Sequence, residues 1–396
     1  MKKIFLITVL IISNNILSQD EFIPLNIKAA FEKGTRSIDG KPGKNYWQNS
    51  ADYEIKIKLD PYKKWIVGSE KVKYYNNSPD SLAELVFRLY QNFYRKNSAR
   101  NFQISTESIT NGVEIEHFEL NGELLNLRKE SIAEFSNTNL IIKLGKKIAP
   151  KSTVTLLINW NHEIPGGTPI RTGMYDSSTF FIAYWYPQIS VYDDIDGWDK
   201  IDFNGEQEMY NDFNNYDVQI EVPNKFGIWA TGVLQNPDEV LHPKIIDRFY
   251  AAHKSEEVVH IITKEDYQNG NVFSSKEETN TWMFKAENVS DFAFGCSDHF
   301  LWDAVNFKPD YNSNRNVFIS AAYNPHSPDF HKVAQVAKEA LLYFTTDLPG
   351  VPYPYPSFTA FNGGGGMEFP MIINDESNTT EAGTIGLTSH EAAHTY

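Results

Sequence analysis

Two histidines and a glutamate near the end of the printed sequence have the spacing of a zinc-binding motif. His390, Glu391 and His394 form the pattern H-E-x-x-H. In a helix, residues four apart lie on one face, so both imidazoles can reach a single Zn²⁺ ion at about 2.0–2.1 Å. Glu391 then projects beside the open coordination position, where it can take a proton from zinc-bound water and pass it to a leaving amine. We therefore expect one zinc ion, with His390 and His394 as ligands and Glu391 as the general base.

The same residues also permit a purely structural interpretation. Thr388 and Glu391 form a T-x-x-E capping box, so Glu391 could cap the start of a helix. The two histidines would then be a solvated or packed pair. A second motif is needed to decide between the two interpretations.

A glycine run followed by a short segment with one acid precedes the histidines. Residues 363–366 are all glycine and lead into Met367-Glu368-Phe369-Pro370. Glycines permit one backbone to approach another closely, and the segment after them is typical of a strand. A peptide could dock there by strand addition, with Glu368 meeting its α-ammonium group. The alternative is a flexible turn that carries an exposed glutamate.

Together the two motifs resemble those of the zinc metallopeptidase family of alanyl aminopeptidase and leukotriene-A hydrolase, the M1-like gluzincins. In that family a G-x-M-E-N segment precedes H-E-x-x-H, and here Gly365-Gly366-Met367-Glu368-Phe369 stands at a similar spacing. The resemblance implies a saddle-like β N-terminal domain followed by a thermolysin-like catalytic domain. The site residues that it implies are His390 and His394 as zinc ligands, Glu391 as general base, Glu368 as the anchor of the substrate's free amino group, and Gly365, Gly366 and Met367 along the substrate strand.

Two departures from the family pattern bear on activity. Phe369 replaces the usual Asn, which weakens the expectation of strict amino-terminal specificity. The family's third zinc ligand, a Glu on the following helix, and its oxyanion-stabilising Tyr both lie beyond the second histidine, whereas the printed sequence stops at Tyr396. Because a catalytic zinc site uses three protein ligands, we expect a fragment truncated after the H-E-x-x-H motif, with weak metal affinity and little activity of its own.

The elements that precede these motifs are expected to be strands. From about residue 50 to 300, apolar and polar residues alternate in short runs, as in residues 53–59, and Asn121-Gly122 predicts a two-residue hairpin turn. Other strands are expected at residues 82–90, 153–160, 217–222, 226–230 and 281–285. Many short strands without helical periodicity predict an antiparallel saddle or sandwich.

After about residue 305 the pattern changes to mixed α and β. Ser327-Pro328-Asp329 predicts a helix start with Ser327 as N-cap, and an apolar stripe of helical period continues to Pro349-Gly350. Strands are expected at residues 358–361 and 367–373. The expected domains are therefore a β-rich N-terminal domain over residues 20–305 and an incomplete α+β, thermolysin-like catalytic domain over residues 306–396.

Composition and the first residues indicate a compartment and exclude one class of partner. The net charge of −15 repels phosphate backbones, so nucleic acid is not an expected partner. Lys2 and Lys3 precede a short apolar run, which is typical of a signal peptide over residues 1–19 and too short to span a bilayer. No transmembrane segment is expected elsewhere. We expect export to the periplasm or the medium, while the sequence leaves the oligomeric state open.

These observations lead to one expected function and one alternative. The expected function is that of a secreted zinc metallopeptidase, an aminopeptidase that hydrolyses N-terminal residues from peptides. The alternative is a secreted, aromatic-rich β protein that binds glycan or protein and carries a degenerate, inactive peptidase tail. The 14% aromatic content and the missing third zinc ligand support the alternative. The aromatic stretch at residues 180–186 either fills a core or resembles the family's cleft-facing segment.

Overall fold

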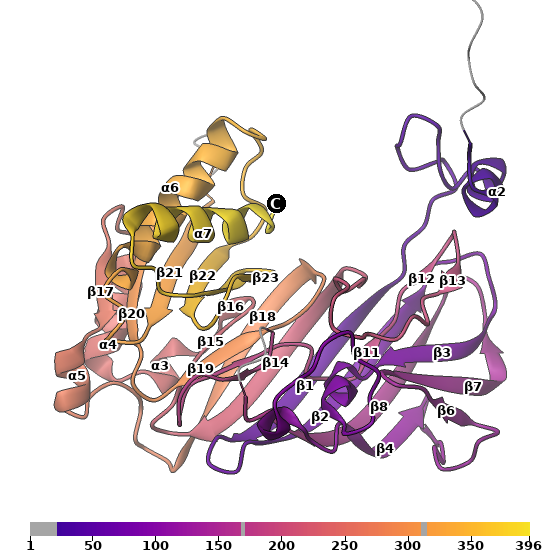
Figure 1. Cartoon of the computed structure of the whole chain (residues 1–396), viewed down its shortest axis with the longest axis horizontal. Coiled ribbons are helices and arrows are strands. Elements are labelled where there is room, and N and C mark those ends of the chain that lie inside the picture. The colour runs from indigo at the N-terminus through magenta and orange to yellow at the C-terminus, as the bar shows by residue number, and fades with distance from the viewer. Residues whose placement is uncertain (1–21, 168–170, 310–314) are drawn as a thin grey trace, which may run out of the picture. The chain divides into compact units, whose positions relative to one another are not determined.

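The computed structural model describes residues 22–167, 171–309 and 315–396, and its fold is mainly β (Figure 1). The expected signal peptide over residues 1–19 lies outside the described residues. Among the described helices, none combines the length and the apolar character needed to cross a membrane. The described residues up to Gln48, together with Tyr192–Trp198, form one compact unit, and Asn49–Val191 with Asp199–Tyr396 form another.

The smaller unit contains one helix and one short hairpin. Helix α2 (Leu25–Lys33) ends at Gly34, and β12 (Tyr192–Asp193) pairs with β13 (Gly197–Trp198). Arg36 binds Asp194 of the hairpin through both carboxylate oxygens. None of the expected site residues lies in this unit.

The first two thirds of the larger unit are built from three sheets. One has eight strands, in the spatial order β16 (Val233–Leu234), β18 (Thr279–Val289), β14 (Asn214–Pro223), β1 (Ser50–Asp60), β2 (Trp65–Asn76), β8 (Ser152–Glu163), β4 (Glu114–Leu120) and β5 (Glu123–Leu124). A second runs β15 (Gly227–Ala230), β19 (Phe294–Ser297), β10 (Phe180–Ile182) and β9 (Gly173–Met174). The third runs β11 (Gln188–Ile189), β3 (Leu82–Arg88), β7 (Asn139–Ile148) and β6 (Ala133–Phe135).

These sheets confirm the strands expected from alternation. Each predicted run before residue 290 coincides with a strand, although the run at 82–90 extends two residues past β3 and that at 226–230 begins one residue before β15. The exposed and buried residues of β1 alternate as its sequence does. The turn between β4 and β5 is also confirmed, because Asn121 and Gly122 have φ values of 52° and 83°. Pairing is antiparallel except between β1 and β14, which are parallel. Their long separation in sequence leaves room for the crossover that a parallel pair needs.

The rest of the larger unit contains a mixed six-stranded sheet and most of the helices. The sheet runs β17 (Val259–Ile262), β20 (Leu301–Phe307), β21 (Val317–Tyr323), β22 (Ser357–Asn362), β24 (Ile372–Asp375) and β23 (Met367–Phe369). The α-helices are α3 (Pro237–Val240), α4 (Pro243–Ala252), α5 (Lys264–Gln268), α6 (Val333–Thr346) and α7 (Glu381–Ala393), with 3₁₀ turns at Tyr90–Tyr94, Thr106–Ser108 and Phe330–Lys332. The predicted domain boundary at residues 305–306 falls inside β20 and stays a prediction.

Helices α6 and α7 pack on the six-stranded sheet (Figure 1). Val333, Ala337 and Leu341 of the apolar stripe of α6 are fully buried in one core with strand residues such as Ile319, and Ala392 of α7 joins the same core. Burial of each large aliphatic side chain contributes about 1.5–3 kcal/mol. This core therefore holds α7, and with it the H-E-x-x-H motif, in a fixed place on the sheet.

The predicted start of α6 is wrong by several residues. The helix begins at Val333 after a 3₁₀ turn, not after Ser327. The Ser327 hydroxyl donates instead to Asn362 Oδ1 at 2.6 Å. The Asp329 carboxylate accepts from the Asn378 N–H at 2.8 Å and the Thr384 hydroxyl at 2.9 Å. Both side chains are therefore used for tertiary contacts, which sequence periodicity does not show.

The predicted capping box is also wrong. Helix α7 begins further upstream, with Thr380 as its N-cap accepting from the Gly383 N–H at 3.1 Å. Thr388 lies in the middle of the helix and donates its hydroxyl to Asp375 Oδ2 at 2.6 Å. The cap interpretation of Glu391 is thereby removed, because Glu391 lies near the C-terminal end of the helix.

The strand expected over residues 367–373 is two strands. β23 and β24 are antiparallel neighbours, and the chain reverses between them at Met371, whose φ is 64°. A left-handed conformation is rare for a non-glycine residue. The reversal leaves β23 at the edge of the sheet, hydrogen-bonded to β24 alone among the described strands.

The glycine run before β23 is supported by a loop from the second sheet. The Tyr175 hydroxyl accepts from Asn374 Nδ2 at 2.6 Å, and a Cβ added at Gly363 would lie 2.9 Å from the Tyr175 ring. The next residue, Asp176, binds His299 Nε2 at 3.3 Å, while His299 Nδ1 contacts Asp298 at 2.9 Å. The hydrogen bond to Asp176, and then that to Asp298, raise the pKa of His299 to about 9. Burial is the largest influence on Asp176 and raises its pKa, but the hydrogen bonds to His299, Ser178 and Thr179 and the charge of His299 together lower the pKa to about 2.

We predict that this ion cluster makes stability depend on pH in a defined window. The raised pKa of His299 contributes stability fully below about pH 6.5, the unfolded value, and loses it as the pH rises to about 9. The lowered pKa of Asp176 contributes above about pH 4 and is lost toward pH 2. Since His299 is one-third exposed, H299Q should cost only about 1 kcal/mol of unfolding free energy at pH 5–6. Urea melts at pH 5.5 and pH 9.5 check this, because the cost should shrink at the higher pH; an equal cost at both would contradict it.

Candidate functional site

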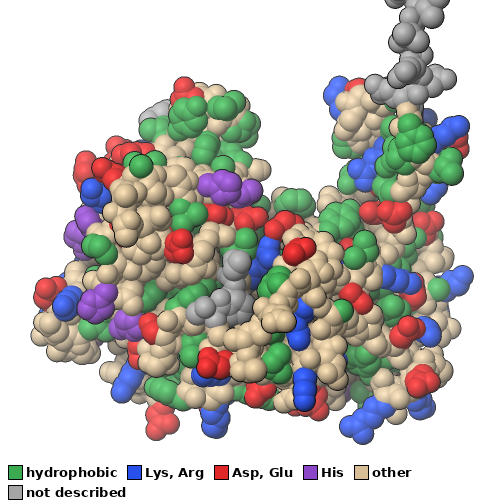
Figure 2. All heavy atoms as spheres, in the orientation of Figure 1, with side chains coloured by type: hydrophobic (Ala, Val, Ile, Leu, Met, Phe, Trp, Pro, Cys, Tyr) green, Lys and Arg blue, Asp and Glu red, His purple; other side chains and the backbone are tan. Residues whose placement is uncertain are grey.

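The two histidines of the motif lie on one face of α7, as the spacing predicts. His390 Nε2 and His394 Nε2 are 3.2 Å apart, and both side chains are exposed. His394 follows the last helical residue but keeps helical dihedrals, with φ −63° and ψ −17°. Figure 2 shows exposed histidine side chains over the end of α7, next to acidic side chains.

Glu391 points from α7 to the strand side and is held in a narrow space. Its side chain is buried, and Oε2 has no hydrogen-bond partner among the described residues. A Cβ added at Gly366 would lie 2.2 Å from Glu391 Oε1. Real Cβ atoms do not approach an oxygen this closely, so a side chain at residue 366 would displace the Glu391 carboxylate, the far end of a flexible side chain, from this position.

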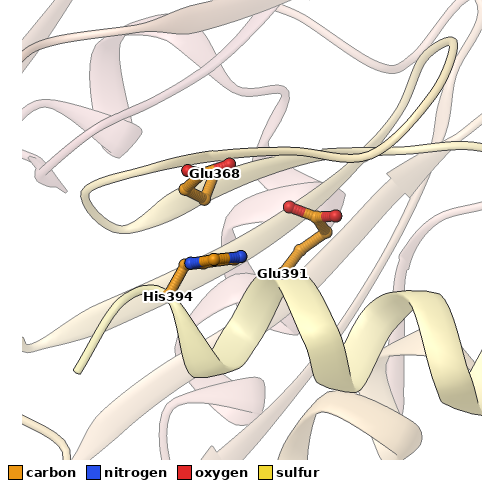
Figure 3. Close-up of side chains that lie close together, drawn as sticks. All are labelled: Glu368, Glu391 and His394. Atoms are coloured by element: carbon orange, nitrogen blue, oxygen red, sulfur yellow. The ribbon is translucent and has the colours of Figure 1, made fainter. Parts of the chain in front are cut away.

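Glu368 on β23 faces the same space from the other side. The ligand atoms of Glu368, Glu391 and His394 all lie within 4.8 Å of one another, and the three side chains converge in Figure 3. His390 adjoins this cluster through its contact with His394. The structure therefore brings together the four residues for which the sequence predicts chemistry.

The nitrogen geometry fits a zinc ion. Two ligands of a tetrahedral Zn²⁺ with Zn–N bonds of about 2.0–2.1 Å are about 3.3 Å apart, and His390 Nε2 and His394 Nε2 are 3.2 Å apart. Glu391 offers a buried oxygen without a partner beside them. Imidazole and carboxylate are ligands that zinc prefers. The residues present are thus compatible with zinc, with His390 and His394 as the residues that would hold it.

Electrostatics raise the pKa of Glu391 to about 7. Burial is the main cause, and the negative charges of Glu368 and Glu208 act in the same direction, while His394 lowers the value. Asp375 at the end of β24 also has a pKa raised to about 7 by burial, in spite of the hydrogen bond from Thr388. Asp375 is thus a buried acid that connects β24 to α7 through its hydrogen bond with Thr388.

Two neighbours of the site were missed by sequence reasoning. Glu208 lies in an irregular segment without a recognisable motif, and with Glu368 and His394 it lines a cavity of about 250 Å³. Asp375 could have been found, because it is an acid at the end of a short apolar run, and it is the last residue of the buried strand β24. Glu208 offered no such signal.

The predicted substrate-strand residues lie at the β23–β24 hairpin, whereas most of the aromatic stretch at residues 180–186 lies in the core. Gly365 has a φ of 83° and donates its N–H to Glu376 Oε2 at 3.2 Å, and Met367 pairs with Asn374 across the hairpin. Most of the aromatic stretch is buried in the core, including Phe180, Phe181, Trp185 and Tyr186. Tyr184 differs, because it lines the same cavity as Glu368.

Comparison with known proteins supports the fold. No protein-family model matches the sequence, and no curated protein matches it. The structure is similar to that of an M1 zinc metallopeptidase from Deinococcus radiodurans, with 11% identity and a TM-score of 0.51 over 90% of this chain. It is also similar to a mutant M1 zinc metallopeptidase of that organism bound to the substrate Tyr-Ser-Ala, with 11% identity and a TM-score of 0.50. The chain spans 66% of the length of these two structures.

We predict that one methyl group added at residue 366 disturbs the position of Glu391. Gly366→Ala should displace the Glu391 carboxylate or push β23 from α7, and should destabilise the protein by about 1–3 kcal/mol as an overpacked site does. Gly386→Ala is the matched control, because its Cβ would meet nothing within 4 Å on the exposed face of α7. The control should be neutral or stabilising by about 0.5–1 kcal/mol. Thermal melts of both variants compare the two, and equal stability would show that the contact is not tight.

Proposed function

We propose that this protein is a zinc metallopeptidase, and specifically an aminopeptidase that acts on peptide substrates after export. The observation that carries the proposal is the pair of imidazole nitrogens 3.2 Å apart beside two carboxylates, all on elements held by the core. The fold shared with M1 zinc metallopeptidases supports the same conclusion.

Each residue of the cluster has a proposed role. When bound at His390 and His394, zinc would polarise a carbonyl and lower the pKa of a water molecule. The Glu391 carboxylate accepts a proton from the attacking water and returns it to the leaving amine. Its buried position keeps bulk water away from that proton.

Glu368 and its strand are proposed to bind the substrate backbone. β23 is an edge strand among the described residues, so an extended peptide can add to it through backbone hydrogen bonds. Gly365, Gly366 and Met367 line this strand, and Glu368 then receives the α-ammonium group. The charge of the amino group would offset the negative charges of Glu368 and Glu391, which lie close together.

The alternative of a non-catalytic binding protein gains no specific support. It rested on the aromatic content and on the missing third zinc ligand, and of these the aromatic residues at 180–186 are mostly buried in the core. A catalytic zinc uses three protein ligands, and the described cluster provides two imidazoles.

We predict that removal of the proposed base abolishes hydrolysis and leaves the metal site intact. Glu391→Gln in the intact, zinc-loaded protein should lower kcat for an aminoacyl anilide or a short peptide by about 10²–10⁴-fold, because the water loses its proton acceptor. Zinc content, measured by atomic absorption, should stay unchanged.

The matched control is Glu381→Gln, at the start of the same helix. Glu381 is exposed and makes only a surface ion pair with Lys332, which contributes little. The control should keep its activity. Hydrolysis by Glu391→Gln at the rate of the unmodified protein would refute the proposed role.

A further inference from the structure

The loop between β9 and β10 carries a tyrosine that contacts the chain leading into β23. The Tyr175 hydroxyl accepts a hydrogen bond from Asn374 Nδ2 at 2.6 Å. A Cβ added at Gly363 would lie 2.9 Å from the Tyr175 ring, and one added at Gly364 would lie 3.0 Å from it. Because neither glycine carries a side chain, the ring can pack directly against the backbone of the glycine run. Tyr175 therefore contacts both the glycine run and β24, the strand that pairs with β23.

The hydrogen bond between Tyr175 and Asn374 joins a neutral hydroxyl to a buried amide. Burial raises the pKa of Tyr175 to about 12, although hydrogen bonds from Asn374 and from the Gly364 backbone act in the opposite direction. Asn374 is fully buried, so water cannot simply take the place of the Tyr175 hydroxyl. Removal of the hydroxyl would deprive a buried donor of this acceptor, which is unfavourable and promotes a local shift of the hairpin.

Hydrogen bonds fix the loop that carries Tyr175 on the second sheet. The Tyr175 N–H donates to the carbonyl oxygen of Thr179 at 2.9 Å and closes the loop. The Ser178 hydroxyl donates to Asp298 Oδ1 at 2.7 Å, and the hydroxyls of Thr179 and Ser297 lie 3.0 Å apart. Because the loop is held at both of its ends, the Tyr175 side chain restricts the movement of the chain that it contacts.

The hairpin that Tyr175 contacts carries the residues proposed to bind substrate. Met367 lies opposite Asn374, and Glu368 lies opposite Ile373. β23 is three residues long and pairs with β24 alone among the described strands. The chain before it consists of glycines, which have the greatest backbone freedom of all residues. Such a strand has few restraints of its own, so a contact opposite Met367 restricts the position of Glu368 as well.

We propose that Tyr175 is a positioning residue, whose ring and hydroxyl hold the glycine run and β23 in the conformation to which a peptide backbone adds. This inference rests on the proposed peptidase function and adds a residue to it. Tyr175 acts through the β23–β24 hairpin, whereas His390, Glu391 and His394 lie on or at the end of α7. Loss of Tyr175 therefore weakens substrate binding more than it slows the catalytic step.

Amide hydrogen exchange tests the effect on the hairpin independently of hydrolysis. In Tyr175→Phe, which keeps the ring and removes the hydroxyl, residues 363–369 of the intact protein should exchange about fivefold faster. In Tyr175→Ala, which also removes the ring, exchange of the same residues should be faster still. Exchange in α7 should stay unchanged in both variants, because the apolar core that holds this helix is not altered.

Steady-state kinetics separate positioning from a general loss of structure. With trialanine as substrate of the intact, zinc-loaded protein, Tyr175→Phe should raise KM about fivefold and change kcat by less than about twofold. A merely structural role would lower the amount of folded enzyme, which reduces the apparent kcat and leaves KM unchanged. The matched control is Ser177→Ala, which removes an exposed hydroxyl from the same loop. Its exchange rates and KM should equal those of the unmodified protein.

The outcomes separate this inference from the proposed function. Unchanged exchange of residues 363–369 in both Tyr175 variants overturns the inference, even if the protein hydrolyses peptides. Faster exchange with an unchanged KM also overturns it, because the order of the hairpin would then not matter to the substrate. If the unmodified protein hydrolyses no peptide, the proposed function and the role in substrate binding fail together, while faster exchange would still show that Tyr175 holds the hairpin. Faster exchange with a raised KM and a nearly constant kcat supports both.

Discussion

The close approach of a strand backbone to a helix side chain is the constraint on which the site depends. Glu391 on α7 and Gly366 before β23 are so near that a Cβ at residue 366 would lie 2.2 Å from Glu391 Oε1. This approach buries the carboxylate and places Glu368 opposite His394. No side chain at residue 366 separates the Glu391 carboxylate from the chain that leads into β23.

Helix α7 is held against the β23–β24 hairpin by polar contacts as well as by the apolar core. Thr388 on α7 donates to Asp375 at the end of β24. Asp329 before α6 accepts from Asn378 and Thr384, which fixes the beginning of α7. Buried polar contacts of this kind specify one arrangement, because a shift of the helix would leave the carboxylates without partners.

Local pattern predicted fewer than half of the strands and only the helices α6 and α7, and it missed long strands such as β2 and β7. Alternation identified strands such as β1, and Asn121-Gly122 identified a hairpin turn, because the required φ values are a property of those two residues. The helical spacing of His390 and His394 predicted their common face, since four residues make about one turn.

The errors and omissions have a common physical cause. Ser327 and Thr388 carry the chemistry of helix caps, but tertiary partners, Asn362 and Asp375, take their hydroxyls. Sequence alone does not show which distant acceptor receives the hydrogen bond of each hydroxyl. In the same way, Glu208 comes to lie beside Glu368 and His394 through the packing of segments far apart in the chain, which no local pattern encodes.

Anomalous X-ray scattering at the zinc edge, from crystals of the intact protein grown with zinc, tests the central claim most directly. The account predicts one strong anomalous peak at about 2.0–2.1 Å from His390 Nε2 and His394 Nε2, with the Glu391 carboxylate beside it. An absence of zinc between these two nitrogens in a crystal soaked with excess metal would contradict the account.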